Sequence, residues 1–367
     1  MTLILAVIAA LGAVAFATGV ASAEAAHVWS IYLVNLLFWS GLAVTGPAIA
    51  GMMELTEARW SPSVKRLALT TAGFLPVSLL LFILLFAGRA ELYAWVREPV
   101  ANKAVWLNVP FMTARILLGG FVLFWVCLTY AGAVYRDDAS SQGKARRNRL
   151  ATILLVLFVV VVSLWGFDLV MSIDPRWYSG LFGGYFVVST LYTGFALLSI
   201  LTIRAHASGQ LSAPPAVVQD VAKLQFALSI MWMYFFWSQY LVIWYGNVPI
   251  ETRFFLRRLF VDPWRILAWV ILVVGWLIPF GYLLKRLTGR PPERHAPLFV
   301  IAVLGLVAIF LERIFVIFPS VSARNAIPHS LYDVLITLGF LSLFILSRRW
   351  FFARFKPVLN VPAVSHH

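Results

Sequence analysis

Acidic and basic side chains lie within the long apolar segments of this 367-residue chain, where charges are rare. Asp168 is near the end of one such segment, and Asp333 is in the first turns of another. Glu312 and Arg313 lie well inside a third segment. Charges within a membrane-spanning helix are costly, so each is a functional-site hypothesis. Carboxylates at such positions can accept and release protons.

Several protonatable or hydrogen-bonding residues fall at a similar depth, near the same predicted face of the membrane. They fit a proton path or a quinol head-group site, because quinol oxidation requires groups that accept protons. We expect them to meet in space beneath the outer head groups. The candidates are Asp168, Asp174, Gln239, Tyr245, Glu312, Arg313 and Asp333.

A structural role is the alternative for each of these candidates. Glu312 and Arg313 could pair with groups on other helices and fix packing. Asp168 and Asp333 have no obligatory basic partner within one turn, which favours function. Asp174 lies in an external loop and could instead cap a helix or contact a partner subunit.

A second set lies near the opposite face, at Glu57, Asp220 and Lys223. These residues are either solvated loop charges or the inner mouth of a proton path.

Redox and metal motifs are missing from the sequence. None of the six His residues pairs with another within one span at a spacing that would hold a haem. Cys127 is the only cysteine, so it cannot form an internal disulfide or an iron–sulfur site. We therefore predict no metal site, no redox cofactor bound by this chain and no certain catalytic residue.

The amino-acid composition is typical of a protein that is embedded in a lipid membrane. Hydrophobic residues make up 62% of the chain and charged residues 12%, and the mean hydropathy is +0.88. A soluble domain has roughly 25% charged residues. The net charge of +14 does not indicate nucleic-acid binding, because the basic residues lie in short loops between apolar segments.

The apolar segments predict an all-α integral membrane protein that forms a single polytopic domain over 1–367. A span needs about 20 apolar residues. The ten predicted spans are 3–22, 28–53, 64–88, 111–135, 148–171, 181–204, 218–245, 264–285, 296–318 and 328–350. The first resembles a signal peptide, with a small-x-small pattern at 21–23. We interpret it as a retained helix because no positive charge precedes it.

Loop charges predict the orientation of the chain. Most of the 29 Lys and Arg residues lie in the even-numbered loops and the C-terminal tail, so both termini should be cytoplasmic. Pro47, Pro76 and Pro279 lie inside spans, and other groups must satisfy the carbonyls that they leave free. Gly180 and Gly184 predict a close approach of helices.

Four motifs resemble the polysulfide-reductase (NrfD-like) family of membrane subunits, and in particular the ActF-type subunit of alternative complex III. Residues 167–179 (FDLVMSIDPRWYS) with 183–186 (GGYF) are similar to the signature between helices five and six. Residues 236–252 (FWSQYLVIWYGNVPIET) are the most specific match. Residues 107–111 and 311–320 fit the same subunit, so the resemblance covers most of the chain.

The resemblance implies a fold and a function. The fold would be two four-helix bundles, at 28–171 and 181–318, with flanking helices at 1–22 and 328–350. The protein would belong to a respiratory or photosynthetic quinol:electron-acceptor oxidoreductase in the bacterial cytoplasmic membrane. Quinol, such as menaquinol, would be oxidised at the periplasmic side of the first bundle, and protons could be conducted.

The family also implies partners. These are an ActC-like paralogous membrane subunit, an iron–sulfur subunit, multihaem cytochrome c subunits, lipids and, in some complexes, a terminal oxidase. Haem c and the iron–sulfur clusters would lie in those partners. The quinol-binding paralogue has a membrane-embedded His, which spans 64–88 and 111–135 lack here. Direct quinol binding by this chain therefore stays open.

Two other functions are compatible with the residues. A secondary transporter also has prolines and charges within its spans, but it would show paired broken segments in two inverted halves, which this sequence does not. A structural membrane anchor would use the same buried charges for packing alone.

Overall fold

The computed structural model describes residues 1–58, 62–136, 139–211, 215–285, 295–321 and 325–355, which form helices and, within these ranges, no strands. Ten helices are long and apolar enough to cross a membrane in the described part of the chain, so this is an all-α, multi-pass membrane protein. The spanning helices are Thr2–Val20, Ala25–Leu55, Pro62–Leu92, Val109–Arg136, Ser141–Ile173, Phe182–Ala207, Ala216–Gly246, Trp264–Leu284, Ala296–Val321 and Leu331–Phe355.

Three of these spans change their helical pitch along their length. A 3₁₀ segment, Thr70–Phe74, separates α3 (Pro62–Leu69) from α4 (Leu75–Leu85). A π-helical turn, Trp165–Val170, follows α7 (Ser141–Leu164). Another, Val273–Leu277, joins α11 (Trp264–Leu272) to α12 (Ile278–Leu284). Hydropathy identifies each span but carries no signal for these local changes in hydrogen bonding.

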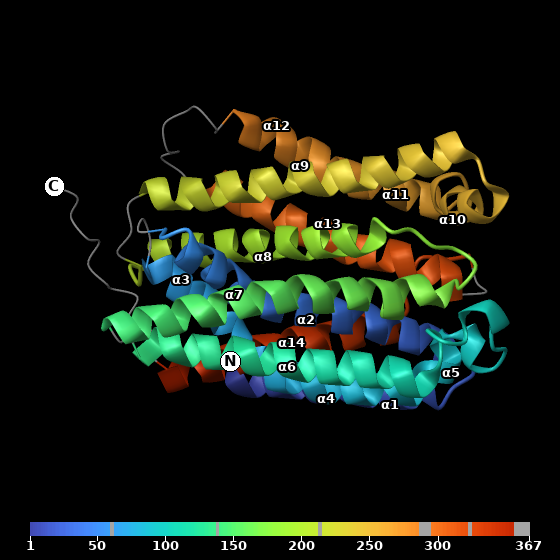
Figure 1. Ribbon diagram of the computed structural model, residues 1–367, viewed down its shortest axis with the longest axis horizontal. Helices are drawn as coiled ribbons and strands as arrows, with labels where there is room; N and C mark the ends of the chain where they lie inside the picture. Colours follow the sequence, from blue (N-terminus) through green and yellow to red (C-terminus); the bar gives the residue numbers. More distant parts are fainter. Residues whose placement is uncertain (59–61, 137–138, 212–214, 286–294, 322–324, 356–367) are drawn as a thin grey trace.

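The helix α2 (Ala25–Leu55) occupies the centre of the molecule. It contacts α4, α7, α8 (Phe182–Ala207) and α13 (Ala296–Val321). Within this helix, 94% of an 18-residue apolar stretch is buried. In Figure 1 the long helices run side by side along one axis, with α3 at one end and α5 (Arg89–Leu92) and α10 (Pro249–Leu259) at the other. These ends are named the α3 end and the α10 end below.

The remaining spans enclose this centre. The helix α6 (Val109–Arg136) contacts α7 and α4, while α9 (Pro215–Gly246) contacts α8 and α12. The helices α1 (Thr2–Val20) and α14 (Leu331–Phe355) contact each other along their lengths. At their crossing, a Cβ on Gly12 would lie 2.7 Å from the Cα of Gly339, so only glycine fits.

The approach predicted at Gly180 and Gly184 is only half right. Gly180 precedes α8 and has no atom near the position that a Cβ would take. A Cβ on Gly184 would meet the Phe235 ring at 2.7 Å, so that glycine does permit close contact with α9. The two residues fall on opposite sides of the helix start, which a four-residue spacing alone does not reveal.

The carbonyl four residues before each of the three interior prolines accepts a hydrogen bond, and for Pro47 and Pro279 the donor is a side chain of another span, as predicted. Pro47 has no N–H for the Ala43 carbonyl, and the Thr71 hydroxyl donates to that oxygen at 3.1 Å. The Gly275 carbonyl, four residues before Pro279, accepts from the Tyr192 hydroxyl at 2.8 Å. The Ala72 carbonyl, four residues before Pro76, accepts the N–H of Leu75.

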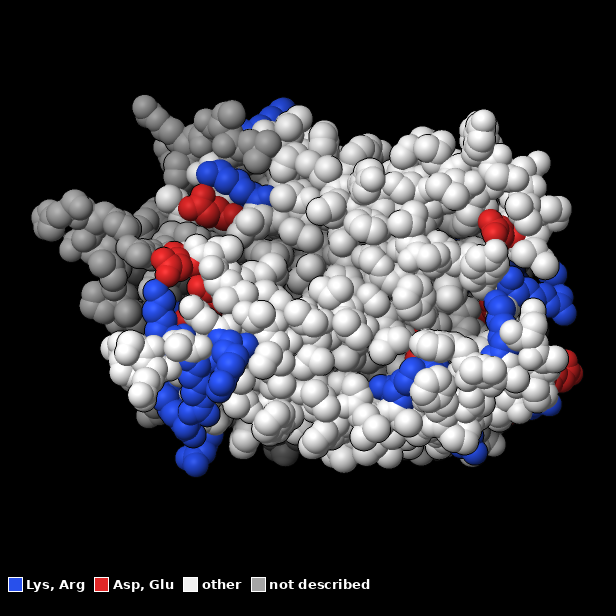
Figure 2. Space-filling model, viewed as in Figure 1, with Lys and Arg blue, Asp and Glu red and all other residues white. Residues whose placement is uncertain are grey.

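Charged side chains gather toward the two ends of the face that Figure 2 shows, and the central part of that face carries none. This distribution matches a protein whose middle lies in hydrocarbon, because charges there would lose their hydration. Lys and Arg are prominent at the α3 end.

Candidate functional site

Asp168 lies in the π-helical turn after α7, and its side chain has no exposed surface. Both of its carboxylate oxygens accept hydrogen bonds from Arg115 of α6, each at 3.0 Å. The indole Nε1 of Trp106 donates to Oδ1 at 2.8 Å. The carboxylate is therefore held by three charge-assisted or polar bonds from the segment 106–115.

Asp168 has no basic partner within one turn, as the sequence indicated, but it has one on another helix. Arg115 is 53 residues away in the sequence, so a search within one turn could not find it. Its guanidinium lies 3.9 Å from the Trp106 ring centroid and 4.1 Å from that of Phe111. Two aromatic faces and a carboxylate thus stabilise one nearly buried cation.

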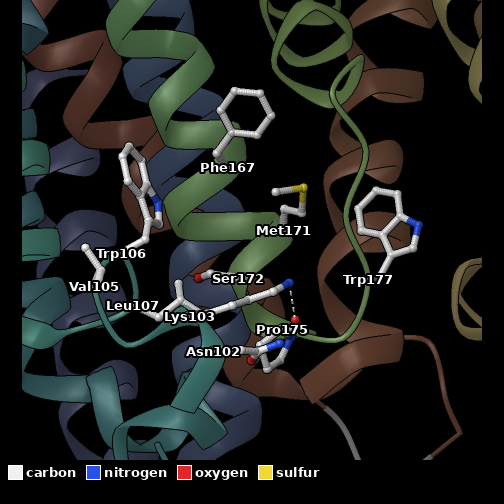
Figure 3. Close-up of a pocket in the computed structure, with 10 residues that line it drawn as sticks. All are labelled: Asn102, Lys103, Val105, Trp106, Leu107, Phe167, Met171, Ser172, Pro175 and Trp177. Carbon is white, nitrogen blue, oxygen red and sulfur yellow. Dashed lines mark hydrogen bonds between the residues drawn. The ribbon is translucent and has the colours of Figure 1, made fainter. Parts of the chain in front are cut away.

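A pocket of about 290 Å³ adjoins this ion pair at the α10 end. Figure 3 shows Trp106 on one side of it and Trp177 on the other, with Phe167 and Met171 between them. Lys103 also lines the pocket, and its ammonium donates to the Pro175 carbonyl at 2.7 Å. The walls are mostly apolar with a few polar groups, as in many ligand sites.

Trp177 packs against α10, a helix in the segment between the predicted spans 218–245 and 264–285. The Trp177 ring stacks on Phe254 with 3.7 Å between centroids and 6° between planes. Pro249 at the first position of α10, Glu251 in its first turn and basic residues in its last turn are signals that could have predicted the helix.

Glu312 and Arg313 form a second ion pair, on α13. Arg313 Nη1 donates to Glu312 Oε2 at 2.8 Å, and both side chains are almost fully buried. Arg313 Nη2 also donates to the hydroxyls of Ser189 and Thr190 on α8, each at 2.9 Å. These contacts agree with the packing alternative, because they tie α13 to α8.

The second carboxylate oxygen of Glu312, Oε1, has different surroundings. Glu312 Oε1 forms no hydrogen bond of standard geometry within the described chain, and the Tyr185 side chain is its close polar neighbour. A cavity of about 30 Å³ next to it is lined by Glu312, Tyr185 and Trp232. Such a cavity is large enough for one water molecule.

Asp333 forms a third pair, with His27 at the start of α2. His27 Nε2 lies 2.8 Å from Asp333 Oδ1. Oδ2 accepts from the backbone N–H of Ser330 at 2.7 Å and from its hydroxyl at 2.9 Å. This arrangement is like a capping box at the beginning of α14, and it accounts for the burial of Asp333.

The remaining outer candidates are dispersed. Gln239 is buried, and its Oε1 accepts from the Ser179 hydroxyl at 3.2 Å. Asp174 accepts from the backbone N–H of Arg176 at 3.3 Å in an exposed turn. Tyr245 is 85% exposed. The expectation of one shared cluster is therefore wrong: the three carboxylates Asp168, Glu312 and Asp333 each pair with a different residue.

The inner candidates form surface contacts at the α3 end. Glu57 pairs with Lys144 at 2.7 Å, and Asp220 pairs with Lys223 at 3.0 Å. All four side chains are substantially exposed, which agrees with solvated loop charges. The neighbouring Glu54 is more buried and binds both Lys65 and Arg147.

A further buried cation was missed by the sequence analysis. Arg258 of α10 donates to the Phe315 carbonyl at 3.1 Å and to the Val316 carbonyl at 2.9 Å. Pro319 cannot supply the usual donor to the Phe315 carbonyl. Burial lowers the pKa of Arg258 to about 9, an effect that the Asp174 carboxylate opposes, so the side chain is charged at neutral pH.

Comparison with known proteins adds no identification, since no family model and no curated protein matches this chain.

Proposed function

We propose that this protein is a non-haem membrane subunit of a quinol:electron-acceptor oxidoreductase of the alternative complex III type. The proposal rests on the resemblance of residues 167–186 and 236–252 to NrfD-like subunits. The observation that carries it further is the aromatic pocket beside the Trp106–Asp168–Arg115 contacts.

The pocket suits a planar, mostly apolar ring that carries hydroxyl groups. Trp106, Phe167 and Trp177 supply aromatic surface, and Ser172 supplies a hydroxyl. Its volume of about 290 Å³ is near the lower limit for small-ligand sites and fits a head group whose tail extends into lipid. Asp168 would act as a positioning residue here, because its bonds to Arg115 and Trp106 orient the Trp106 ring that lines the pocket.

Glu312, and not Asp168, would accept and release the proton. The Glu312 carboxyl group lines a cavity that can hold one water molecule. That geometry allows a proton to be exchanged through water without first breaking the contact with Arg313. We propose Glu312 as the proton-carrying group of the second bundle.

A structural membrane anchor is the second candidate function. It is favoured by one observation, the separate partner residue of each buried carboxylate. In that case the ion pairs would orient helices, and the partner subunits would perform all of the chemistry.

Purification from native membranes under mild conditions tests the proposal. We expect the tagged chain to retain partners with c-type haem, visible by their absorption, and iron–sulfur clusters. A chain that purifies alone, colourless and stable would contradict it.

Quinol oxidation by the intact complex separates the two candidates. Trp106→Phe keeps an aromatic ring but removes the donor to Asp168, and we expect kcat/KM for quinol to fall by about tenfold, equivalent to about 1.5 kcal/mol. Trp125→Phe is the matched control, because Trp125 lies on α6 with 61% of its surface exposed. Equal activity of both variants would favour the anchor.

A further inference from the structure

A groove with a volume of about 810 Å³ lies at the α3 end, remote from the pocket described above. It is formed between the last turns of α14 and the start of α1. Its walls include Arg348, Arg349, Trp350 and Phe352 from α14 and Thr2 from α1.

The groove has a strongly positive lining. Arg348 and Arg349 are adjacent in sequence and both line it, while no Asp or Glu does so in the described chain. Arg204 places a further positive charge close enough to interact with Arg348. Neither Arg348 nor Arg349 forms an ion pair with a carboxylate of the described residues. The charge is therefore available to an external anion.

Arg348 is held in place before any ligand arrives. Its Nε donates to the Thr70 hydroxyl at 2.9 Å, which fixes the guanidinium against the 3₁₀ segment between α3 and α4. A planar guanidinium fixed in this way can offer its terminal nitrogens to a phosphate in a defined direction.

The surroundings of the groove are those of a membrane interface. Trp350 is 63% exposed, and an amphipathic indole ring favours the depth of the head groups. Next to Thr2, the first turn of α1 exposes Leu3 and Ile4. An apolar surface thus continues from the positive groove along the helices, where acyl chains would lie.

We propose that this groove binds an anionic phospholipid, with its phosphate on Arg348 and Arg349 and its acyl chains against α1 and α14. Basic recesses between membrane helices recognise such head groups by charge. The apolar continuation favours a lipid over a soluble phosphate, because a free anion would leave that surface unused. The site is independent of the function proposed for the other end of the molecule.

Native mass spectrometry of the full chain, purified in detergent and stripped of lipid, tests this assignment. The probes are dioleoyl phosphatidylglycerol and dioleoyl phosphatidylcholine, which have the same acyl chains. We expect phosphatidylglycerol to bind at least about fivefold more tightly than phosphatidylcholine. Each Lys or Arg near an anionic lipid surface increases the affinity by about a factor of five.

Two variants localise the effect. Arg349→Gln should weaken phosphatidylglycerol binding by about fivefold and leave phosphatidylcholine binding unchanged. Arg354→Gln removes the same charge from an exposed position on the last turn of α14 that does not line the groove, and it should change neither. Arg349→Lys, which keeps the charge, should retain the preference.

Three results would overturn the proposal. Equal binding of the two lipids by the unsubstituted chain would exclude recognition of charge. An equal loss in Arg349→Gln and Arg354→Gln would indicate a general surface potential. Displacement of phosphatidylglycerol by an equal concentration of inorganic phosphate would assign the groove to a soluble anion.

Discussion

At the scale of the residue, burial makes each charge of this protein depend on its partner. Asp168 and Arg115 have 0% and 10% of their side chains exposed, so neither can be solvated adequately when the other is removed. The pair need not stabilise the fold more than two apolar residues would. What it does provide is orientation, because two parallel hydrogen bonds fix the planes of both groups.

A double-mutant cycle measures this dependence. We expect Asp168→Asn alone to lower the free energy of unfolding by about 3–5 kcal/mol, because Arg115 would keep its charge in a buried site. Adding Arg115→Gln should recover part of that loss, because the remaining buried charge is then removed. Thermal unfolding of the purified chain in detergent checks both values. Simple additivity of the two substitutions would show that they do not interact.

The acids themselves could be predicted from the sequence, but their partners could not. A carboxylate in an apolar segment is costly, which is enough to single out Asp168, Glu312 and Asp333. The partner of Asp168 is 53 residues away in the sequence, and that of Glu312 is the adjacent residue. The partner of Asp333 is 306 residues away. Only the tertiary arrangement of the helices decides between these cases.

At the scale of the element, interior prolines couple one helix to the next. Pro47 leaves the Ala43 carbonyl without its helical donor, and Thr71 of the neighbouring span supplies one. A Cβ on Gly46 would lie 2.1 Å from the Thr71 oxygen, so the glycine allows this approach. The proline, the glycine and the threonine therefore act together to hold α2 against the 3₁₀ segment.

We expect Thr71→Val to lower the free energy of unfolding by about 1 kcal/mol, since it keeps the shape of the side chain and leaves a buried carbonyl unsatisfied. Thr129→Val is the matched control. Thr129 donates to the Trp125 carbonyl of its own helix at an exposed position, and its loss should have little effect. Thermal unfolding in the same detergent compares the two. An equal effect of both substitutions would contradict a special role for the carbonyl freed by Pro47.

The crossing of α1 and α14 depends on two glycines. A methyl group on Gly12 would lie 2.7 Å from the Gly339 backbone and 2.8 Å from the Leu335 carbonyl, and backbone atoms cannot move aside locally. We expect Gly12→Ala to cost about 1–3 kcal/mol of stability despite the better helix propensity of alanine. Gly120→Ala on α6, where a Cβ meets no atom within 4 Å, should be neutral or stabilising. Melting temperatures of the two variants test this, and no difference between them would show that α1 packs loosely.

The sequence predicts where the membrane-spanning helices lie, but not the 3₁₀ and π-helical segments within them. Twenty apolar residues indicate a span whatever its pitch, so the 3₁₀ and π-helical segments leave hydropathy unchanged. α10 was missed for a different reason: it is a short amphipathic helix outside the apolar segments, visible only through Pro249 and its terminal charges.

At the scale of the whole molecule, the central part of one face carries no charge. Together with the ten candidate spans of the described chain, this indicates that the middle of the molecule lies in the hydrocarbon of a bilayer. The molecule has one end with the candidate pocket and another with the arginine-lined groove. If most basic loops face the cytoplasm, the pocket opens toward the outer side and the groove toward the inner leaflet. The orientation therefore decides which compartment each site can exchange with.

Site-directed labelling tests that orientation. Cys127 is the only cysteine and is buried, so Cys127→Ala gives a background without reactive thiols. Ala101→Cys places a thiol in an exposed loop at the α10 end, and Gln142→Cys places one at the exposed start of α7 near the α3 end. In intact cells, a maleimide that cannot cross membranes should label Ala101→Cys but not Gln142→Cys, because Lys and Arg retain the α3 end inside. Both should react after permeabilisation, which shows that each thiol is accessible. The reverse pattern in intact cells would place the candidate quinol pocket on the cytoplasmic side and contradict the proposed periplasmic chemistry.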